Sequence, residues 1–147
     1  MGVDPGVRGG LAVLRADGTC AHLRAFRPDM TRGDFNSAVR CAVGELRYAG
    51  GSVAYLEQVQ HITGDGAQGS FTFGRIYGWC EMALTAHGVT VRDVRPMMWQ
   101  ASLECLTGGD KNVSKRRAIA LFPREKITHA VADALLISEY GRRRIVL

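Results

Sequence analysis

Three acidic residues occupy places where acidic side chains are uncommon, and together they could hold metal ions. Asp4 ends a short apolar strand before a Pro-Gly turn, Glu57 lies near the end of another apolar strand, and Asp133 lies in the first turn of the last predicted helix. Acidic residues are depleted from strands, and they are rarely fully buried unless they are paired or bound to a cation. These positions mark Asp4, Glu57 and Asp133 as candidate catalytic residues and metal ligands.

Each of the three also has an ordinary structural explanation. Asp4 could form an Asx-turn with the residues that follow it. Glu57 could pair with an arginine such as Arg75, and Asp133 could be a favourable charge near a helix N-terminus. The catalytic interpretation therefore depends on whether the three side chains converge.

Convergence follows if the first and fourth predicted strands are neighbours in one sheet. Asp4 and Glu57 would then meet at one end of that sheet, and a helix packed there could bring Asp133 to them. Three adjacent carboxylates repel one another and need divalent cations. Oxygen ligands suit Mg²⁺ or Mn²⁺ rather than zinc, and two such ions ~3.5–4 Å apart could support phosphodiester hydrolysis.

His129 and Lys111 are two further candidates for the active site. His129 precedes Asp133 by four residues, so both face the same side of a continuous helix. It could orient water, shuttle a proton or ligate a metal, or it could be a helix cap or a surface residue. Lys111, in the predicted loop TGGDKN, could contact the scissile phosphate or a metal-bound water, or it could be an ordinary exposed lysine.

The order of the predicted elements indicates an α/β fold. The elements are strands near Val3, at 11–14 and at 21–26, a helix over 35–46, a strand over 52–59, a helix from Ser70 to His87, a strand over 89–96, and helices over 97–106, 115–122 and 130–140. Glycine turns separate the first three strands, which predicts an antiparallel meander. The alternating elements that follow imply a five-stranded mixed sheet flanked by helices on both faces, as a single domain over residues 1–147.

Start and stop signals predict several helix boundaries. Thr31 and Asp34 form a shortened capping box before the first helix. Ser114 is expected to cap the helix over 115–122, and Gly141 is expected at the C-terminal end of the last helix.

Charge and composition favour a soluble protein that binds a polyanion. The net charge is +5, and Lys and Arg contacts to phosphates release condensed counterions. No apolar run is long enough to span a membrane and no signal peptide is evident, so we expect a cytoplasmic protein, or an organellar one if a transit peptide has been removed. The four widely spaced cysteines are expected to be reduced core thiols and not zinc ligands.

The ordered motifs resemble those of the RuvC-type Holliday junction resolvases. GVDPGVRGGLAVL is followed by YLEQVQ and later by HAVADALLISEYGRR. The resemblance is closest to the phage-encoded and chloroplast-type branch, in which LEQ precedes a glycine-rich loop and the next strand leads to a Pro and a Trp, here Pro96 and Trp99. A lysine-bearing segment ending in Leu-Phe-Pro follows, here Lys111 to Pro123, so the resemblance covers essentially the whole chain in order.

This resemblance implies an RNase H-like fold, a homodimer, and paired symmetrical nicks across a four-way DNA junction with Mg²⁺ or Mn²⁺. By this resemblance, Asp4, Glu57 and Asp133 correspond to the metal-binding carboxylates of the family. Lys111 corresponds to its active-site lysine. Relatives have a further Asp, or in some a His, a few residues before the last carboxylate, whereas this chain reads KITHAVAD there. Either His129 takes that role or the fourth ligand is missing.

In the resembled family, the region after the second carboxylate enters the centre of the junction. It includes a glycine-rich loop, here His61 to Gly69, and an aromatic wedge, for which Phe71 or Phe73 is the candidate. At helical spacing one of these two rings should lie in the core. The other candidate DNA contacts, each of which could instead be an exposed polar residue, are Gln68, Arg75, Lys115, Arg116 and Arg117.

The helix from Ser70 also bears on assembly. It carries Gly74 and Gly78 beside Trp79 and Met82, a combination that suits close packing inside the domain or across a two-fold axis.

Three other functions compete with junction resolution. Another RNase H-like nuclease would act on RNA–DNA hybrids or flaps, and a non-catalytic junction-binding module would fit the missing fourth acid. GVDPGVRGG also resembles the first phosphate loop of the ATPase and sugar-kinase superfold. Those proteins need two such lobes and the chain is too short for both, so we expect no nucleotide cofactor, and no membrane partner either.

Overall fold

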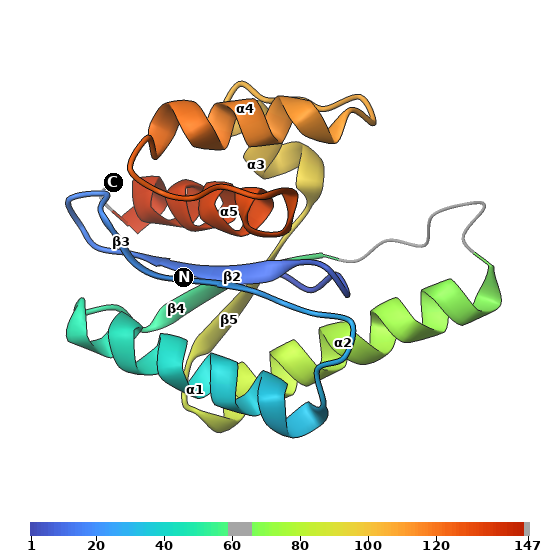
Figure 1. Cartoon of the computed structure of the whole chain (residues 1–147). Helices are drawn as coiled ribbons and strands as arrows, with labels where there is room; N and C mark the ends of the chain where they lie inside the picture. The colour runs from blue at the N-terminus through green and yellow to red at the C-terminus, as the bar shows by residue number, and fades with distance from the viewer. Residues whose placement is uncertain (59–65, 146–147) are drawn as a thin grey trace.

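The strands form a single mixed sheet whose order places β1 beside β4 (Figure 1). A computed structural model of the chain describes residues 1–58 and 66–145. The strands are β1 (Gly2–Asp4), β2 (Gly10–Leu14), β3 (Cys20–Ala25), β4 (Val53–Glu57) and β5 (Thr90–Val94), in the spatial order β3-β2-β1-β4-β5. β2 is antiparallel to β1 and β3, whereas β4 is parallel to β1 and β5. The predicted five-stranded mixed sheet with an N-terminal meander is confirmed.

Helices cover both faces of this sheet (Figure 1). On one face lie α1 (Arg32–Tyr48) and α2 (Ala67–Ala86); on the other, α5 (His129–Ile145) packs against the sheet and carries α3 (Pro96–Ser102) and α4 (Lys111–Leu121) on its outer side. Because successive side chains of a strand point to opposite faces, β4 supplies both cores. Leu56 packs with the α1–α2 side and Tyr55 with the α5 side.

The N-terminal signals of the helices are confirmed for α1 and wrong for α4. The hydroxyl of Thr31 accepts from the backbone N–H of Asp34, and the carboxylate of Asp34 accepts from the backbone N–H of Thr31. α4 begins four residues earlier than predicted, because Asp110 and not Ser114 caps it: Oδ1 of Asp110 accepts from the backbone N–H of Asn112 at 2.9 Å. Ser114 is buried inside α4. α2 likewise begins at Ala67, ahead of the predicted start.

The last helix continues through Gly141, which was predicted to end it. α5 runs to Ile145, and Gly141 lies in its interior against β4. A Cβ at this position would come within 2.6 Å of Cε2 of Tyr55. The glycine is therefore explained by the close approach of helix to sheet and not by a helix terminus.

Gly141→Ala should destabilise the fold by about 1–3 kcal/mol, because the added methyl overpacks the contact with Tyr55. Gly44→Ala in α1 is the matched control: a Cβ added there would meet no heavy atom within 4 Å, so removing a helical glycine at this position should stabilise by about 0.5–1 kcal/mol. Guanidinium denaturation measures both changes. Equal effects of the two substitutions would show that the contact with Tyr55 does not explain Gly141.

Two expectations from composition can also be compared with the structure. In residues 1–58 and 66–145, no helix is long and apolar enough to cross a membrane. Cys80 and Cys105 are buried, as predicted for core thiols, and Cys20 is half-buried. Cys41 lies exposed on α1, so for this cysteine the prediction was wrong.

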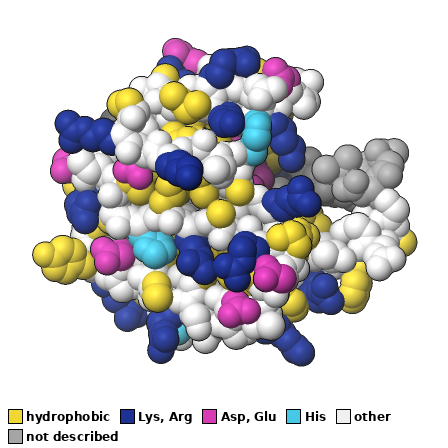
Figure 2. Space-filling model, viewed as in Figure 1, with side chains coloured by type: hydrophobic (Ala, Val, Ile, Leu, Met, Phe, Trp, Pro, Cys, Tyr) yellow, Lys and Arg dark blue, Asp and Glu magenta, His cyan; other side chains and the backbone are white. Residues whose placement is uncertain are grey.

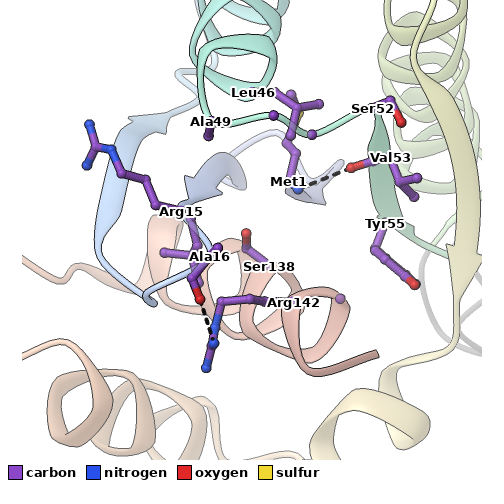
Figure 3. Close-up of a pocket in the computed structure, with 14 residues that line it drawn as sticks. Met1, Arg15, Ala16, Leu46, Ala49, Ser52, Val53, Tyr55, Ser138 and Arg142 are labelled. Carbon is purple, nitrogen blue, oxygen red and sulfur yellow. Dashed lines mark hydrogen bonds between the residues drawn. The ribbon is translucent and has the colours of Figure 1, made fainter. Parts of the chain in front are cut away.

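A cavity of about 170 Å³ lies where β1 and β4 begin (Figure 3). Met1, Leu14, Val53, Ser138 and Arg142 are among its lining residues. The N-terminal amine donates to the carbonyl oxygen of Val53 at 3.2 Å, and Arg142 donates to that of Ala16 at 3.1 Å. Asp4 and Glu57 end the same two strands, so this cavity lies at the opposite end of the sheet from the candidate site.

Candidate active site at the ends of β1 and β4

β1 and β4 place Asp4 and Glu57 side by side. The two strands are parallel, and Val3 is paired with Leu56, so Asp4 and Glu57 are the next residues along each strand. Gly2 lies against α5 and Tyr55 packs in the core on the α5 side. Since side chains alternate along a strand, Asp4 and Glu57 point to that same face.

α5 brings Asp133 to this pair. Asp133 lies one turn after His129, the first residue of the helix, and not in its first turn as predicted. Its negative charge raises the pKa of both Asp4 and Glu57, as expected for carboxylates that share one site. The three predicted carboxylates therefore lie within electrostatic reach of one another.

Burial is the main cause of the raised pKa of all three carboxyl groups. It raises the pKa of Asp4 to about 6 and that of Glu57 to about 8, and the neighbouring charge of Asp4 is the next largest cause for Glu57. Burial also raises the pKa of Asp133, against the opposing effects of Ser114, Lys111 and His129. In the absence of a cation, burial and the charge of Asp4 therefore favour the protonated form of Glu57.

Hydrogen bonds from two other parts of the chain hold Asp4 and Glu57. Oδ1 of Asp4 accepts from the backbone N–H of Gly6 at 2.9 Å, which is the Asx-turn that the sequence allowed. Oε1 of Glu57 accepts from Nε1 of Trp99 at 3.0 Å. No ion pair joins Glu57 to Arg75 in the described part of the chain, because the guanidinium of Arg75 lies over the ring of Trp79, 5.2 Å from its centroid.

Asp133 contains an unpaired buried oxygen. Its Oδ1 is buried and, among the residues that the structure describes, has no hydrogen-bond partner. The hydroxyl of Ser114 lies close enough to lower the pKa of Asp133, but it also lies 3.2 Å from the carbonyl oxygen of Lys111. A hydroxyl has one proton, so it can serve only one of these acceptors at a time.

The chemistry of the three carboxylates fits a hard divalent cation. They are oxygen donors, one of their buried oxygens has no partner among the described residues, and burial raises the pKa of each, so a bound cation would offset the cost of their negative charge. As the side chains stand, no three His, Cys, Asp or Glu residues within 1–58 and 66–145 are grouped closely enough to hold one ion. To hold a shared ion, the three side chains would have to rotate toward it.

Lys111 and His129 border the same site. Lys111 is exposed and is the first residue of α4, not a loop residue as predicted. Its charge lowers the pKa of Asp4, Glu57 and Asp133 alike. His129 is exposed at the start of α5, and its charge lowers the pKa of Asp133.

The candidate DNA contacts on α2 lie at its exposed beginning, which extends beyond the sheet (Figure 1). Gln68 and Arg75 are exposed, and Phe71 is 70% exposed. Phe73 is only half-buried, so the prediction that one of the two phenylalanines lies in the core was wrong. The first buried residue of α2 is Ile76, because the turns before it have no sheet beneath them. Residues 61–65 of the predicted glycine-rich loop lie outside the described residues.

The basic residues of α4 differ in their surroundings. Arg116 is exposed, with a weak contact of 3.9 Å to Asp110, and Lys115 is half-buried. Arg117 instead donates from Nε to the carbonyl oxygen of Leu103 at 2.7 Å. Figure 2 shows Lys and Arg side chains spread over the visible face among acidic ones, and not gathered into one basic patch.

Two residues that contact the site were not assigned to it from the sequence. Trp99 entered only through the family motif and Ser114 only as a helix cap. A buried tryptophan usually has an acceptor for its indole N–H, so the sequence could have predicted a buried polar partner for Trp99. Its partner could not be known before the strands were placed.

Comparisons with known proteins support the fold of the chain. No model of a known protein family matches it, and no curated protein matches it by sequence. Among solved structures, Thermus thermophilus RuvC in complex with a Holliday junction substrate is similar with a TM-score of 0.72, at 18% identity over 99% of this chain and 93% of that chain. Another Thermus thermophilus RuvC structure has a TM-score of 0.66, at 18% identity over 99% of this chain and 94% of that one. The chain therefore has the RNase H-like fold of RuvC, as the motifs predicted.

Proposed function

We propose that this protein is a divalent-metal-dependent endonuclease that cuts four-way DNA junctions. The observation that carries the proposal is the electrostatic coupling of Asp4, Glu57 and Asp133 at the ends of β1 and β4. The similarity of the whole chain to RuvC bound to a Holliday junction suggests the substrate.

In this proposal, Asp4, Glu57 and Asp133 hold two Mg²⁺ or Mn²⁺ ions. When bound, such ions would activate water and stabilise the charge on the leaving oxygen. The ammonium group of Lys111, which already lies within reach of the three carboxylates, would bind the scissile phosphate. His129 is exposed next to Asp133 and would exchange a proton with solvent or serve as the fourth ligand.

The exposed beginning of α2 would enter the junction. The ring of Phe71, near the start of α2, is 70% exposed, and an exposed ring can stack on an unpaired base. Arg75, beside that ring, would contact a phosphate. Paired nicks need two sites, so we expect a homodimer, for which Met82, 66% exposed on the same helix, is a candidate contact.

The decisive experiment compares a synthetic four-way junction with linear duplex DNA and an RNA–DNA hybrid, each with Mg²⁺ or Mn²⁺. We expect symmetrical nicks in the junction alone, and sedimentation equilibrium should give a dimer. Equal cutting of the hybrid would instead support another RNase H-like nuclease. Junction binding without nicking would support a non-catalytic module.

Two neighbouring arginines of α4 should respond differently to loss of charge. Arg116→Gln should make the slope of log K against log [salt] for junction binding less steep by ~0.9, the value for one lost phosphate contact. It should leave the free energy of unfolding unchanged. Arg117→Gln should lower the free energy of unfolding by about 1 kcal/mol, because its hydrogen bond to Leu103 is lost. Fluorescence anisotropy at several salt concentrations and chemical denaturation measure the two effects. If Arg117→Gln leaves stability intact and reduces the salt slope, then Arg117 is a DNA contact after all.

A further inference from the structure

Trp99 connects the core beneath α3 with one carboxylate of the candidate site. Its side chain is completely buried, packed with Tyr55, Val94, Leu103 and other residues of the α5 side. The indole N–H is its only polar group and can only donate. It donates to Oε1 of Glu57 at 3.0 Å, across 42 positions of sequence.

The path of the chain after β5 places this donor. Val94, the last residue of β5, is paired with Glu57, and α3 begins at Pro96 immediately afterwards. Trp99 therefore lies on the first turn of a helix that starts next to the carboxylate. The backbone N–H of Gln58 also donates to the carbonyl oxygen of Val94 at 2.8 Å, which fixes the end of β4 beside β5.

A single directed hydrogen bond restricts how the Glu57 carboxylate can rotate. The indole holds Oε1, so Oε2 is the oxygen that would face a bound cation. Asp4 is held in the same way, with Oδ1 bound to the N–H of Gly6. Each of the two strand-end carboxylates thus has one oxygen held by the protein. Groups that orient metal ligands in this way typically change metal affinity or activity by roughly 10–100-fold when they are lost.

We propose that Trp99 is a positioning residue that orients the Glu57 carboxylate for a divalent cation. The inference rests on the proposed function only in assigning Glu57 as a ligand. The alternative is that Trp99 has a structural role only: it fills the core, and its hydrogen bond to Glu57 does not affect cation binding.

Trp99→Phe separates these two explanations, because it keeps an aromatic ring in the core and removes the donor. We expect Mn²⁺ affinity, measured by calorimetry, to fall about 10-fold or more. Junction binding without a cation should not change. Trp79→Phe is the control: Trp79 is the other tryptophan, lies on α2 and packs edge-on against Phe35, so its loss should leave Mn²⁺ affinity unchanged. Unchanged Mn²⁺ affinity in Trp99→Phe, despite a lowered melting temperature, would overturn the proposal.

A second measurement uses the wild-type protein, so it does not depend on the folding of Trp99→Phe. The two tryptophans give two indole N–H signals in a ¹⁵N NMR spectrum, and Trp79→Phe assigns them. Mg²⁺ should shift the Trp99 signal in a saturable way, with the midpoint that calorimetry gives for Mg²⁺ itself, and leave that of Trp79 in place. An unmoved Trp99 signal at saturating Mg²⁺ counts against the proposal. Cation binding without junction nicking would overturn the proposed function alone, whereas no cation binding by the wild type would overturn both.

Discussion

Asp4→Asn should reduce junction nicking by a factor of about 1,000 or more while leaving the fold intact. The substitution removes the negative charge that a divalent cation needs, and it keeps an oxygen that can accept from the N–H of Gly6. It also removes a buried charge whose pKa is raised by burial, so stability should be equal or greater. Nicking of a labelled four-way junction under single-turnover conditions measures the loss.

Asp29→Asn is a suitable control for this substitution. Asp29 is an exposed carboxylate in a surface ion pair with Arg27 at 3.1 Å, and such pairs contribute about 0–1 kcal/mol. Asp29→Asn should nick junctions at the wild-type rate. In EDTA, both Asp29→Asn and Asp4→Asn should bind the junction with wild-type affinity. Nicking by Asp4→Asn within about tenfold of the wild-type rate would remove Asp4 from the mechanism.

Glu57→Gln should make the cation-free protein more stable than the wild type at pH 8, and the two should be similar at pH 5. Burial and the charge of Asp4 raise the pKa of Glu57 from 4.5 to about 8. Between those values the folded protein binds more protons than the unfolded chain, so wild-type stability falls as pH rises through this window. Each pKa unit corresponds to ~1.4 kcal/mol, so a gain of at least about 1 kcal/mol is expected, or a few degrees in melting temperature.

The comparison with Glu57→Gln is needed because other groups titrate in the same range with the opposite sign. Burial lowers the pKa of His22 and that of the N-terminal amine, so both favour the folded state as pH rises. They are present in wild type and variant alike and cancel in the difference. Gln also keeps an oxygen for the indole of Trp99.

Saturating Mg²⁺ extends the same measurement. A cation that binds the folded state alone stabilises it, and it should raise the melting temperature of the wild type at pH 8 far more than that of Glu57→Gln. Equal stabilisation of both proteins would show that Glu57 is not a ligand. A wild type as stable as the variant at pH 8 without cations would show that the pKa of Glu57 is not raised as proposed.

Much of the candidate site was predictable because its parts follow local rules. Strand alternation and the ends of two apolar strands were enough to propose that Asp4 and Glu57 meet, and the structure places β1 beside β4 with both side chains toward α5. The capping box at Thr31 was readable because both of its partners lie within one turn of the chain.

At three places the sequence allowed two local explanations, and only the tertiary structure chose between them. Asp110 and Ser114 are both good helix caps, and in the structure Asp110 caps α4 while Ser114 is buried inside it. Gly141 suits a helix terminus or a close contact, and the position of the Tyr55 ring on β4 selects the contact. Arg75 could have paired with Glu57, but it lies over Phe71 and Trp79 on its own helix.

The sequence alone indicated which residues could carry chemistry: three acids in apolar surroundings, a lysine, and a histidine four residues before the last acid. It also indicated the order of strands and helices that could bring them together. Only the tertiary structure showed which residues donate hydrogen bonds to those groups and which charges shift their pKa values. Trp99 donates to Glu57 across 42 positions, and the charge of Lys111, the first residue of α4, lowers the pKa of all three carboxylates. Chain-local preferences act over a few residues, whereas these contacts depend on how the helices dock on the sheet.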